Sequence, residues 1–335
     1  MVEYTRILIL ASGGGHTGYA ISIAERLIEL DPSIEPLFIV PRGDKWSIDR
    51  INRKLGETKF IEVAKLRNPG ESFVKIIYML PRTFIDSLRI HGFFDVMICT
   101  GSNHGIIPVI TAWFRRVVKS IYCIEDVFRL EKPSRAVNIL HKLGLANVFL
   151  QWREQYRLYD KRSIYAGLVY EKPMYRSVDK GYILVTMGTL GHPSLAELLL
   201  KTNLEYVIVQ TGRLVDPQYI RSRKTGWRVF QFDPDIDKLI AEASVIVSSP
   251  GLTAINAAIA YRKPTIMVYN PNIVLGASFK EIARVAEMLN IPFINPLNIE
   301  PGFFEEIVLN AKPTSVEVVD GGYNISKYIV EFLND

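Results

Sequence analysis

The stretch from Arg6 to Leu30 joins an apolar strand to a helix through a glycine-rich turn. Its sequence is RILILASGGGHTG followed by YAISIAERLIEL. An apolar run of strand length ends at three consecutive glycines, and apolar residues at helical spacing follow at once, which is typical of α/β proteins. Glycine lets a ligand approach the backbone, and the free N–H groups of a first helical turn favour a negatively charged partner. The sequence therefore predicts an anion-binding turn here.

His16 lies at the edge of this turn. The ordinary pKa of histidine lies near neutrality, so the ring can take a proton from a hydroxyl as a bond forms. His16 is thus a candidate general base. The alternative is a glycine turn that only shapes the backbone, beside a histidine with no chemical role.

Strand-like runs alternate with helical stretches along the chain. One set comprises 6–11, 36–40, 59–63, 95–99, 119–124 and 147–151, and a second comprises 182–186, 205–209, 228–232, 244–248 and 264–269. Such alternation predicts α/β domains with parallel sheets, and 335 residues suffice for two. We expect domains over 1–165 and 176–335, a linker over 166–175, and a final helix able to pack back on the first domain.

The second set of strands opens like the first, with YILVTMGTLGHP at 182–193 leading into a helix. Two doubly wound domains would face a central cleft, and ligands bind beyond the carboxyl ends of their strands. Neither glycine turn is a G-x-G-x-x-G or P-loop motif, which disfavours nicotinamide and P-loop chemistry. The aspartates of Asp233–Asp237 could hold a metal, but an Asp there is expected to cap a helix. No metal and no cofactor is predicted.

Charge is unevenly distributed. Residues 1–165 hold 24 Lys and Arg against 17 Asp and Glu, whereas residues 166–335 hold 16 against 18. The basic first half should meet an anionic partner. We find no tract or zinc spacing typical of nucleic-acid binding, so an anionic membrane or a phosphorylated substrate is favoured. No apolar run reaches the roughly 18 residues of a membrane span, no signal peptide is visible, and Cys99 and Cys123 are expected as buried thiols of a cytoplasmic protein.

Four motifs carry a resemblance to a known family. The first turn, CTGSNHGIIP at 99–108, and the run IYCIEDVFR at 121–129 that ends near FLQW at 149–152 resemble the membrane-side subunit of the eukaryotic dolichol-pathway N-acetylglucosaminyltransferase. VTMGT at 185–189 and VSSPGLT at 247–253 resemble the catalytic subunit of that enzyme. Fused in this order, they make a chain similar over nearly its whole length to bacterial MurG and to single-chain archaeal relatives.

This resemblance implies a GT-B fold, UDP-N-acetylglucosamine as donor, a lipid-diphosphate-linked sugar as acceptor, and inverting transfer without a metal. It implies that His16 is the general base and Glu125 a second catalytic residue. The implied nucleotide-sugar site comprises Gly188, Thr189, Gly191, Phe232, Ser249, Gly251, Leu252, Thr253 and Asn256. The implied acceptor site comprises Gly14, Gly15, Thr17, Gly101, Ser102, Asn103 and His104. Helix starts flanked by glycine would meet the charge on the departing UDP.

Some of these residues have other interpretations. Glu125 could cap a neighbouring turn, His104 could be a turn residue, and His192 is not expected to touch a ligand; His91 and His141 are expected on the surface. MurG-like chains carry a glutamate for the donor ribose where this chain has Asn256, and a glutamine pair where it has Ala277 and Ser278. A neutral amide holds a hydroxyl more weakly than a carboxylate does, so the donor stays open.

The segment 72–94 crowds apolar side chains around Lys75, Arg82 and Arg89. This mixture is typical of a helix lying in a lipid interface, and core packing is the alternative. Because the acceptor implied by the resemblance is embedded in a membrane, we favour the interface. The predicted membrane patch comprises Phe73, Lys75, Ile76, Ile77, Met79, Leu80 and Arg82.

Together these features predict a peripheral enzyme on the cytoplasmic face of the cell membrane. It would add N-acetylglucosamine, with a β1-4 linkage to N-acetylglucosamine expected, to a polyprenyl- or dolichyl-diphosphate-linked sugar for N-glycosylation. The alternatives are transfer of another nucleotide sugar, transfer to another lipid such as diacylglycerol, a nucleotide-sugar 2-epimerase, and a membrane-binding module without activity.

Overall fold

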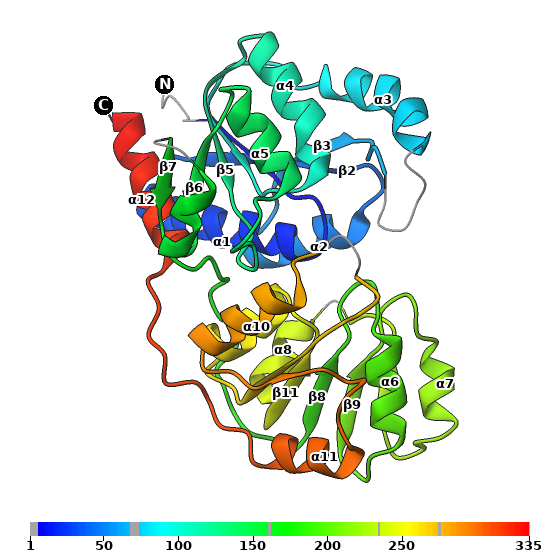
Figure 1. Cartoon of the computed structure of the whole chain (residues 1–335). Helices are drawn as coiled ribbons and strands as arrows, with labels where there is room; N and C mark the ends of the chain where they lie inside the picture. The colour runs from blue at the N-terminus through cyan, green and yellow to red at the C-terminus, as the bar shows by residue number, and fades with distance from the viewer. Residues whose placement is uncertain (1–5, 68–73, 160–161, 234, 274–275, 335) are drawn as a thin grey trace. The chain divides into compact units, whose positions relative to one another are not determined.

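The computed structural model describes residues 6–67, 74–159, 162–233, 235–273 and 276–334. The chain divides into two compact units, the first made of residues 1–171 with 319–335 and the second of residues 172–318. The boundary between residues 171 and 172 therefore falls inside the segment 166–175 that is expected as a linker. The boundary between residues 318 and 319 precedes the final helix. Each unit contains one parallel sheet (Figure 1).

The first unit has a seven-stranded parallel sheet in the order β3-β2-β1-β4-β5-β6-β7. Its strands are β1 (Arg6–Leu10), β2 (Glu35–Pro41), β3 (Lys59–Val63), β4 (Phe94–Cys99), β5 (Val118–Ile124), β6 (Asn147–Leu150) and β7 (Ser163–Tyr165). Its helices are α1 (Gly15–Leu30), α2 (Lys45–Leu55), α3 (Val74–Ser87), α4 (Ile106–Phe114), α5 (Arg135–Lys142) and α12 (Gly321–Asn334), with 3₁₀ turns at Asn103–Gly105 and Arg153–Leu158. In Figure 1, α1, α2 and α12 cover one face of the sheet, and α3, α4 and α5 cover the other.

Alternation along the central strands explains this packing. Leu8, Leu10, Met97 and Cys99 point to one face, where they form one buried cluster with residues of α4 and α5. Cys99 and Cys123 are register partners on β4 and β5. Both are buried free thiols, as the sequence predicts.

The second unit has a six-stranded parallel sheet in the order β10-β9-β8-β11-β12-β13. Its strands are β8 (Ile183–Thr186), β9 (Val207–Gln210), β10 (Arg228–Phe230), β11 (Val245–Ser248), β12 (Thr265–Val268) and β13 (Phe293–Ile294). Its helices are α6 (Pro193–Leu200), α7 (Pro217–Arg221), α8 (Ile236–Glu242), α9 (Leu252–Ile255), α10 (Phe279–Met288) and α11 (Pro301–Leu309), and a π-helical turn over Asn256–Ala260 continues α9.

The predicted fold class is confirmed, because both units are parallel α/β sheets. Each of the eleven predicted strands is present with ends that differ by a few residues. The edge strands β7 and β13 were not predicted. They are three and two residues long, too short to show a pattern in the sequence.

Helix α12 packs on α1, far from it in the sequence. The guanidinium of Arg26 is 1% exposed and donates to Asp320 at 2.8 Å, just before α12. Ser326 on α12 donates from Oγ to the Ile23 carbonyl at 3.1 Å. At Gly322 a Cβ atom would lie 2.6 Å from Ser22 Oγ, so only glycine allows this close approach.

The prediction that His141 lies on the surface is wrong, since His141 is buried on the inner face of α5. Its ring contacts the Tyr159 ring edge-on, and Nδ1 lies 3.3 Å from the Ala146 carbonyl. The last turn of α5 packs against the strand that follows it, which turns this histidine inward. His91 is exposed, as expected.

Candidate active site

The candidate site of the first unit lies where three neighbouring strands end. β1, β4 and β5 are adjacent and parallel, so the turns that follow them meet at one edge of the sheet. The turns are 11–14, 100–105 and 125–134. This edge contains the point at which the strand order reverses, between β1 and β4, where open α/β sheets bind their ligands.

His16 is the second residue of α1 and reaches across to the turn after β4. Its Nδ1 lies 2.6 Å from the carbonyl oxygen of Thr100. Because a carbonyl can only accept, Nδ1 carries the proton of the neutral ring, and Nε2 has a lone pair for a substrate proton. Burial lowers the pKa of His16, with the Asp126 carboxylate and the Thr100 carbonyl acting against this and Lys65 adding to it. The ring is therefore neutral at neutral pH, as a general base must be.

The glycine turn after β1 leads into a start of α1 that no side chain caps. Gly13 and Gly14 have φ of 91° and 56°, which favours glycine at both positions. Gly14 is the N-cap residue of α1 and provides no capping side chain. The first helical turn of α1 begins at Gly15 and contains no acidic residue. Thr17 is buried and accepts the Gly13 N–H at 3.0 Å, which stabilises the turn. The helix start can therefore bind an anion.

The second turn brings a buried histidine to the same edge. Gly101 has φ of 85°, and a Cβ atom there would lie 2.8 Å from the Ile124 carbonyl. Ser102 accepts the His104 N–H at 3.2 Å, whereas Asn103 is exposed. His104 is 4% exposed; the Val40 carbonyl acts on its ring, but among the described residues neither ring nitrogen makes a hydrogen bond of ordinary geometry. Burial and the nearby Lys65 lower the pKa of His104 to about 3, so this ring stays neutral.

Glu125 is fully buried, in contrast to the cleft position implied by the family resemblance. Its carboxylate accepts the backbone N–H of Ser134 at 3.0 Å and of Asp126 at 2.6 Å, and it also accepts the Ser134 and Tyr159 hydroxyls. Burial raises the pKa of Glu125 to about 7, against these hydrogen bonds. Through these hydrogen bonds Glu125 holds the 125–134 turn in place, and its catalytic role stays a prediction.

Sequence reasoning missed Asp126, the next residue. It is half-buried, and its negative charge acts on His16 and opposes the lowering of the histidine pKa by burial. Its Oδ1 accepts the Phe128 N–H at 2.9 Å, which fixes the carboxylate. The only signal in the sequence is its place directly after a strand end. Asp126 can stabilise the positive charge that His16 gains on taking a proton.

In the second unit, the turns after β8 and β11 lie side by side because these strands are neighbours. Gly188 and Gly191 have φ of 69° and 101°. Thr189 is exposed, and Asn270, which sequence reasoning missed, donates to the Gly191 carbonyl at 2.9 Å. Asn270 therefore fixes the backbone of this glycine turn at Gly191, while the turn stays accessible to solvent at Thr189.

The turn after β11 resembles the first turn of the other unit. Gly251 provides no capping side chain at the start of α9. Ser249 is buried, and its hydroxyl has no hydrogen-bond partner among the described residues. Thr253 is half-buried, whereas Leu252 and Asn256 are buried, Asn256 at the start of the π-helical turn. Such π-helical turns occur often at functional sites.

The remaining predicted residues of this unit have mixed positions. Phe232 is half-buried after β10. Ser278, at one position of the missing glutamine pair, caps α10: its hydroxyl accepts the Glu281 N–H, and the Glu281 carboxylate accepts the Ser278 N–H at 2.8 Å. His192 is buried and caps α6 through Nδ1, which accepts the Leu195 N–H at 3.1 Å. Asp235 is the N-cap residue of α8, and among the described residues no cluster of His, Cys, Asp and Glu could hold a metal.

Helix α3 carries its apolar side chains outward. The buried residues of this helix are polar: Thr83, Asp86 and Ser87. Ile77 and Leu80 of the predicted patch are 72% and 43% exposed, Lys75 and Arg82 are exposed, and Ile76 and Met79 are half-buried. Phe73 lies outside the described residues. In the described part of the chain, no helix is long and apolar enough to cross a membrane.

The apolar surface extends beyond the predicted segment to the end of α4. Trp113 and Phe114 are 50% and 79% exposed, and Phe93 is exposed as well. Arg115 donates to the carbonyls of Leu88 and Ile90 at 3.0 and 2.6 Å, which ties the end of α4 to the segment after α3. We call the exposed apolar residues of α3, Phe93, Trp113 and Phe114 the apolar patch.

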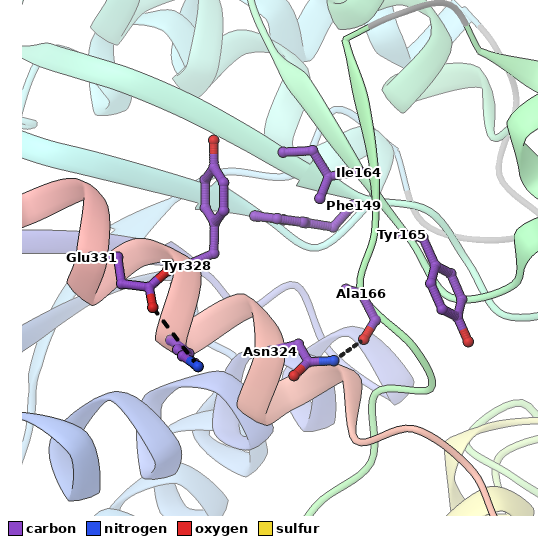
Figure 2. Close-up of a pocket in the computed structure, with 8 residues that line it drawn as sticks. Phe149, Ile164, Tyr165, Ala166, Asn324, Tyr328 and Glu331 are labelled. Atoms are coloured by element: carbon purple, nitrogen blue, oxygen red, sulfur yellow. Dashed lines mark hydrogen bonds and ion pairs between the residues drawn. The ribbon is translucent and has the colours of Figure 1, made fainter.

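A separate pocket of about 270 Å³ lies at the far edge of the first sheet (Figure 2). Figure 2 shows it between β6, β7 and α12, with Phe149 and Tyr328 on its walls. Asn324 closes one end by donating to the Ala166 carbonyl at 2.8 Å. None of the residues predicted from the sequence lines this pocket.

Comparisons with known proteins agree with this organisation. Residues 7–169 match the family described as "Oligosaccharide biosynthesis protein Alg14 like", and residues 182–275 match the "Glycosyltransferase family 28 C-terminal domain". The chain is 25% identical over 337 aligned positions to the UDP-N-acetylglucosamine–N-acetylmuramyl-(pentapeptide) pyrophosphoryl-undecaprenol N-acetylglucosamine transferase of Prochlorococcus marinus strain MIT 9215, covering 91% of this chain and 86% of that protein.

Solved structures share the fold. Acinetobacter baumannii MurG matches with a TM-score of 0.60 and 13% identity over 98% of this chain and 99% of that chain. The UDP-GlcNAc 2-epimerase of Neisseria meningitidis matches with a TM-score of 0.65 and 14% identity over 98% of this chain and 100% of that chain. A transferase and an epimerase thus share this fold, so the fold alone does not distinguish the two activities. The two family matches do, because they join an Alg14-like region to a family 28 glycosyltransferase domain in one chain. This chain is a MurG-like glycosyltransferase.

Proposed function

We propose that this enzyme transfers N-acetylglucosamine from UDP-N-acetylglucosamine to a sugar linked to a polyprenyl or dolichyl diphosphate. The observation that carries the proposal is the His16 ring, whose Nδ1 is occupied by the Thr100 carbonyl and whose pKa is lowered by burial. Support for the donor and for a lipid-linked acceptor comes from the name of the Prochlorococcus relative and from the two family matches.

In the proposed reaction, Nε2 of His16 takes the proton from the acceptor hydroxyl as its oxygen attacks C1 of the donor sugar. The bond from C1 to the UDP oxygen breaks at the same time, and UDP leaves with the electron pair. Attack opposite the leaving group inverts the configuration at C1. Asp126 stabilises the imidazolium that forms, because its negative charge favours the protonated ring.

The donor would occupy the second unit, at the turns after β8 and β11. Gly188 and Gly191 leave backbone accessible to a diphosphate, and the uncapped start at Gly251 offers N–H groups to the charge that grows on UDP. Asn256 would bind the donor ribose or sugar with an amide. The acceptor would bind at the His16 and His104 turns of the first unit.

The apolar patch suits an anionic membrane surface, where the acceptor lipid lies. Lys75 and Arg82 are exposed among the apolar side chains of α3, Arg89 is exposed just after the helix, and the exposed Arg116 follows Phe114 by two residues. Apolar burial and attraction between basic side chains and anionic lipid act together in interfacial binding. This surface supports our proposal that the enzyme acts at the cytoplasmic face of the cell membrane, in lipid-linked oligosaccharide synthesis for N-glycosylation.

A panel of radiolabelled nucleotide sugars tests this function. The protein is incubated with each sugar and with a short prenyl-diphosphate-linked N-acetylglucosamine or diacylglycerol in detergent micelles, with and without EDTA. We expect label to pass from UDP-N-acetylglucosamine to the diphosphate acceptor, with EDTA having no effect because helix starts meet the leaving-group charge. Conversion of the donor to its 2-epimer without lipid, or transfer only to diacylglycerol, would contradict the proposal.

A further inference from the structure

The segment after β3 is held in place by the inner face of α3. The N–H of Ala64 donates to Oδ2 of Asp86 at 2.9 Å, and the Ala64 carbonyl accepts the Thr83 hydroxyl at 3.0 Å. Both α3 side chains are buried. The helix that carries the apolar patch on its outer side therefore fixes, on its inner side, the residue directly before Lys65.

The ammonium group of Lys65 lies next to the glycine turn after β1. Its Nζ lies 3.4 Å from the position that a Cβ atom on Gly13 would occupy, and Asp44 Oδ2 lies 3.2 Å from the same position. Asp44 also caps α2 by accepting the N–H and hydroxyl of Ser47. The charge of Lys65 acts on the rings of both His16 and His104. One cation thus faces the two turns that the acceptor would occupy.

Two further features at this point favour an anion. The start of α1 has neither a capping side chain nor an acidic residue in its first turn. His104 is buried and neutral; the Val40 carbonyl acts on its ring, but neither ring nitrogen makes a hydrogen bond of ordinary geometry among the described residues, so the one N–H of the ring is available to an anion. A group with two adjacent anionic centres could meet the ammonium, the ring N–H and the helix start together.

We propose that Lys65 is the cation that binds the diphosphate of the lipid acceptor, between the turn 11–14 that precedes His16 and the turn 100–105 that contains His104. This inference rests on the proposed function for the identity of the acceptor. Because α3 holds the backbone of Ala64, the segment that carries Lys65 is fixed to the helix that carries the apolar patch.

The same position gives Lys65 an effect on the base. Asp126 and Lys65 act on the His16 ring with opposite signs, and the Thr100 carbonyl holds its Nδ1. An incoming diphosphate would raise the pKa of His16, and Lys65 opposes this rise. Loss of the lysine should therefore move the acid limb of the rate profile to higher pH.

Calorimetric binding of farnesyl diphosphate and farnesyl monophosphate in detergent micelles tests the inference without any turnover. We expect Lys65→Met to weaken diphosphate binding by about tenfold or more and to weaken monophosphate binding less. Lys65→Arg should keep most of the affinity. Lys59→Met, at the exposed start of β3, is the matched control and should bind like the unaltered protein. Equal binding by Lys65→Met, or no diphosphate binding by the unaltered protein, would overturn the inference.

The pH profile of kcat/KM for the short acceptor separates binding from structure. We expect the acid limb to move to higher pH in Lys65→Met and to stay in place in Lys65→Arg, whereas a purely structural lysine would lower the rate equally at every pH. A protein that binds farnesyl diphosphate through Lys65 but transfers no sugar to a lipid diphosphate would refute the proposed function and leave this site standing.

Discussion

His16 combines a fixed tautomer with a lowered pKa, and both follow from its place one residue into α1. Removing the base should lower kcat by about 10²-fold or more while thermal stability stays unchanged. His91→Ala, which changes an exposed histidine, provides the matched control for His16→Ala. The measurements are the initial rate at saturating donor and the melting temperature of each variant. If His16→Ala kept near-normal turnover, another residue would have to be the base.

For Glu125 we predict a change in how stability depends on pH, because the pKa of this carboxyl in the folded state, about 7, lies above its ordinary value. A carboxyl with a raised pKa stabilises the fold fully below its ordinary pKa, and this contribution is lost as the pH rises through 7. Relative to the unaltered protein, Glu125→Gln should therefore gain stability between pH 5 and pH 8, by at most about 3 kcal/mol. Urea denaturation at both pH values measures this change, and a constant difference would contradict it.

Turnover of the same variant tests the positioning role of Glu125. Glutamine cannot accept all the hydrogen bonds that hold the 125–134 turn, so Asp126 should shift relative to His16. We expect a lower kcat with little change in the donor KM. Normal turnover in Glu125→Gln would show that this turn tolerates the change and that the carboxylate has no catalytic consequence.

At the scale of elements, α3 has apolar residues outward and polar residues inward. The paired changes Ile77→Ser and Ile85→Ser, at side chains 72% and 60% exposed, should release the protein from anionic liposomes without lowering the melting temperature. Leu309→Ser, 70% exposed on α11, is the matched control. Liposome flotation at two salt concentrations gives the measurement. A large fall in melting temperature with unchanged flotation would assign these residues to the core.

The inner face of the same helix should behave in the opposite way. Asp86 accepts from the Ala64 N–H and pairs with Arg42, and it is buried. Replacing it with alanine leaves a buried N–H without a partner, which should cost about 2 kcal/mol of unfolding free energy. Arg82→Ala on the exposed side of α3 serves as the comparison. Urea denaturation that showed equal stability for both variants would argue against this account of the helix.

At the scale of the whole molecule, the chain leaves the first unit after residue 171 and returns to it at residue 319. Gly322 sits where α12 meets α1, and a Cβ atom there would lie 2.6 Å from Ser22 Oγ and 3.1 Å from Arg26. Gly322→Ala should therefore destabilise the first unit by about 1–3 kcal/mol. Gly302→Ala, which has open space at its Cβ position, should not. Equal denaturation midpoints for both variants would show that α12 adjusts freely.

Much of the fold followed from the sequence because the responsible interactions are local. Strand-length apolar runs, and glycines at Gly13, Gly101, Gly188 and Gly191 where φ is positive, mark the sheets and the turns at their carboxyl ends. Parallel βαβ units then bring those turns to one edge in each sheet, so the candidate status of His16 could also be predicted.

The tertiary structure alone decided which charges meet. Asp126 and Lys65 follow different strands, far apart in sequence, and only the strand order brings both to bear on His16. Burial, which no local pattern reports, surrounds Glu125 with the groups of the 125–134 turn and turns His141 inward. The outward face of α3 and its continuation at Trp113 also depend on packing, because the sequence pattern of an apolar helix is the same whether the core or a lipid surface covers it.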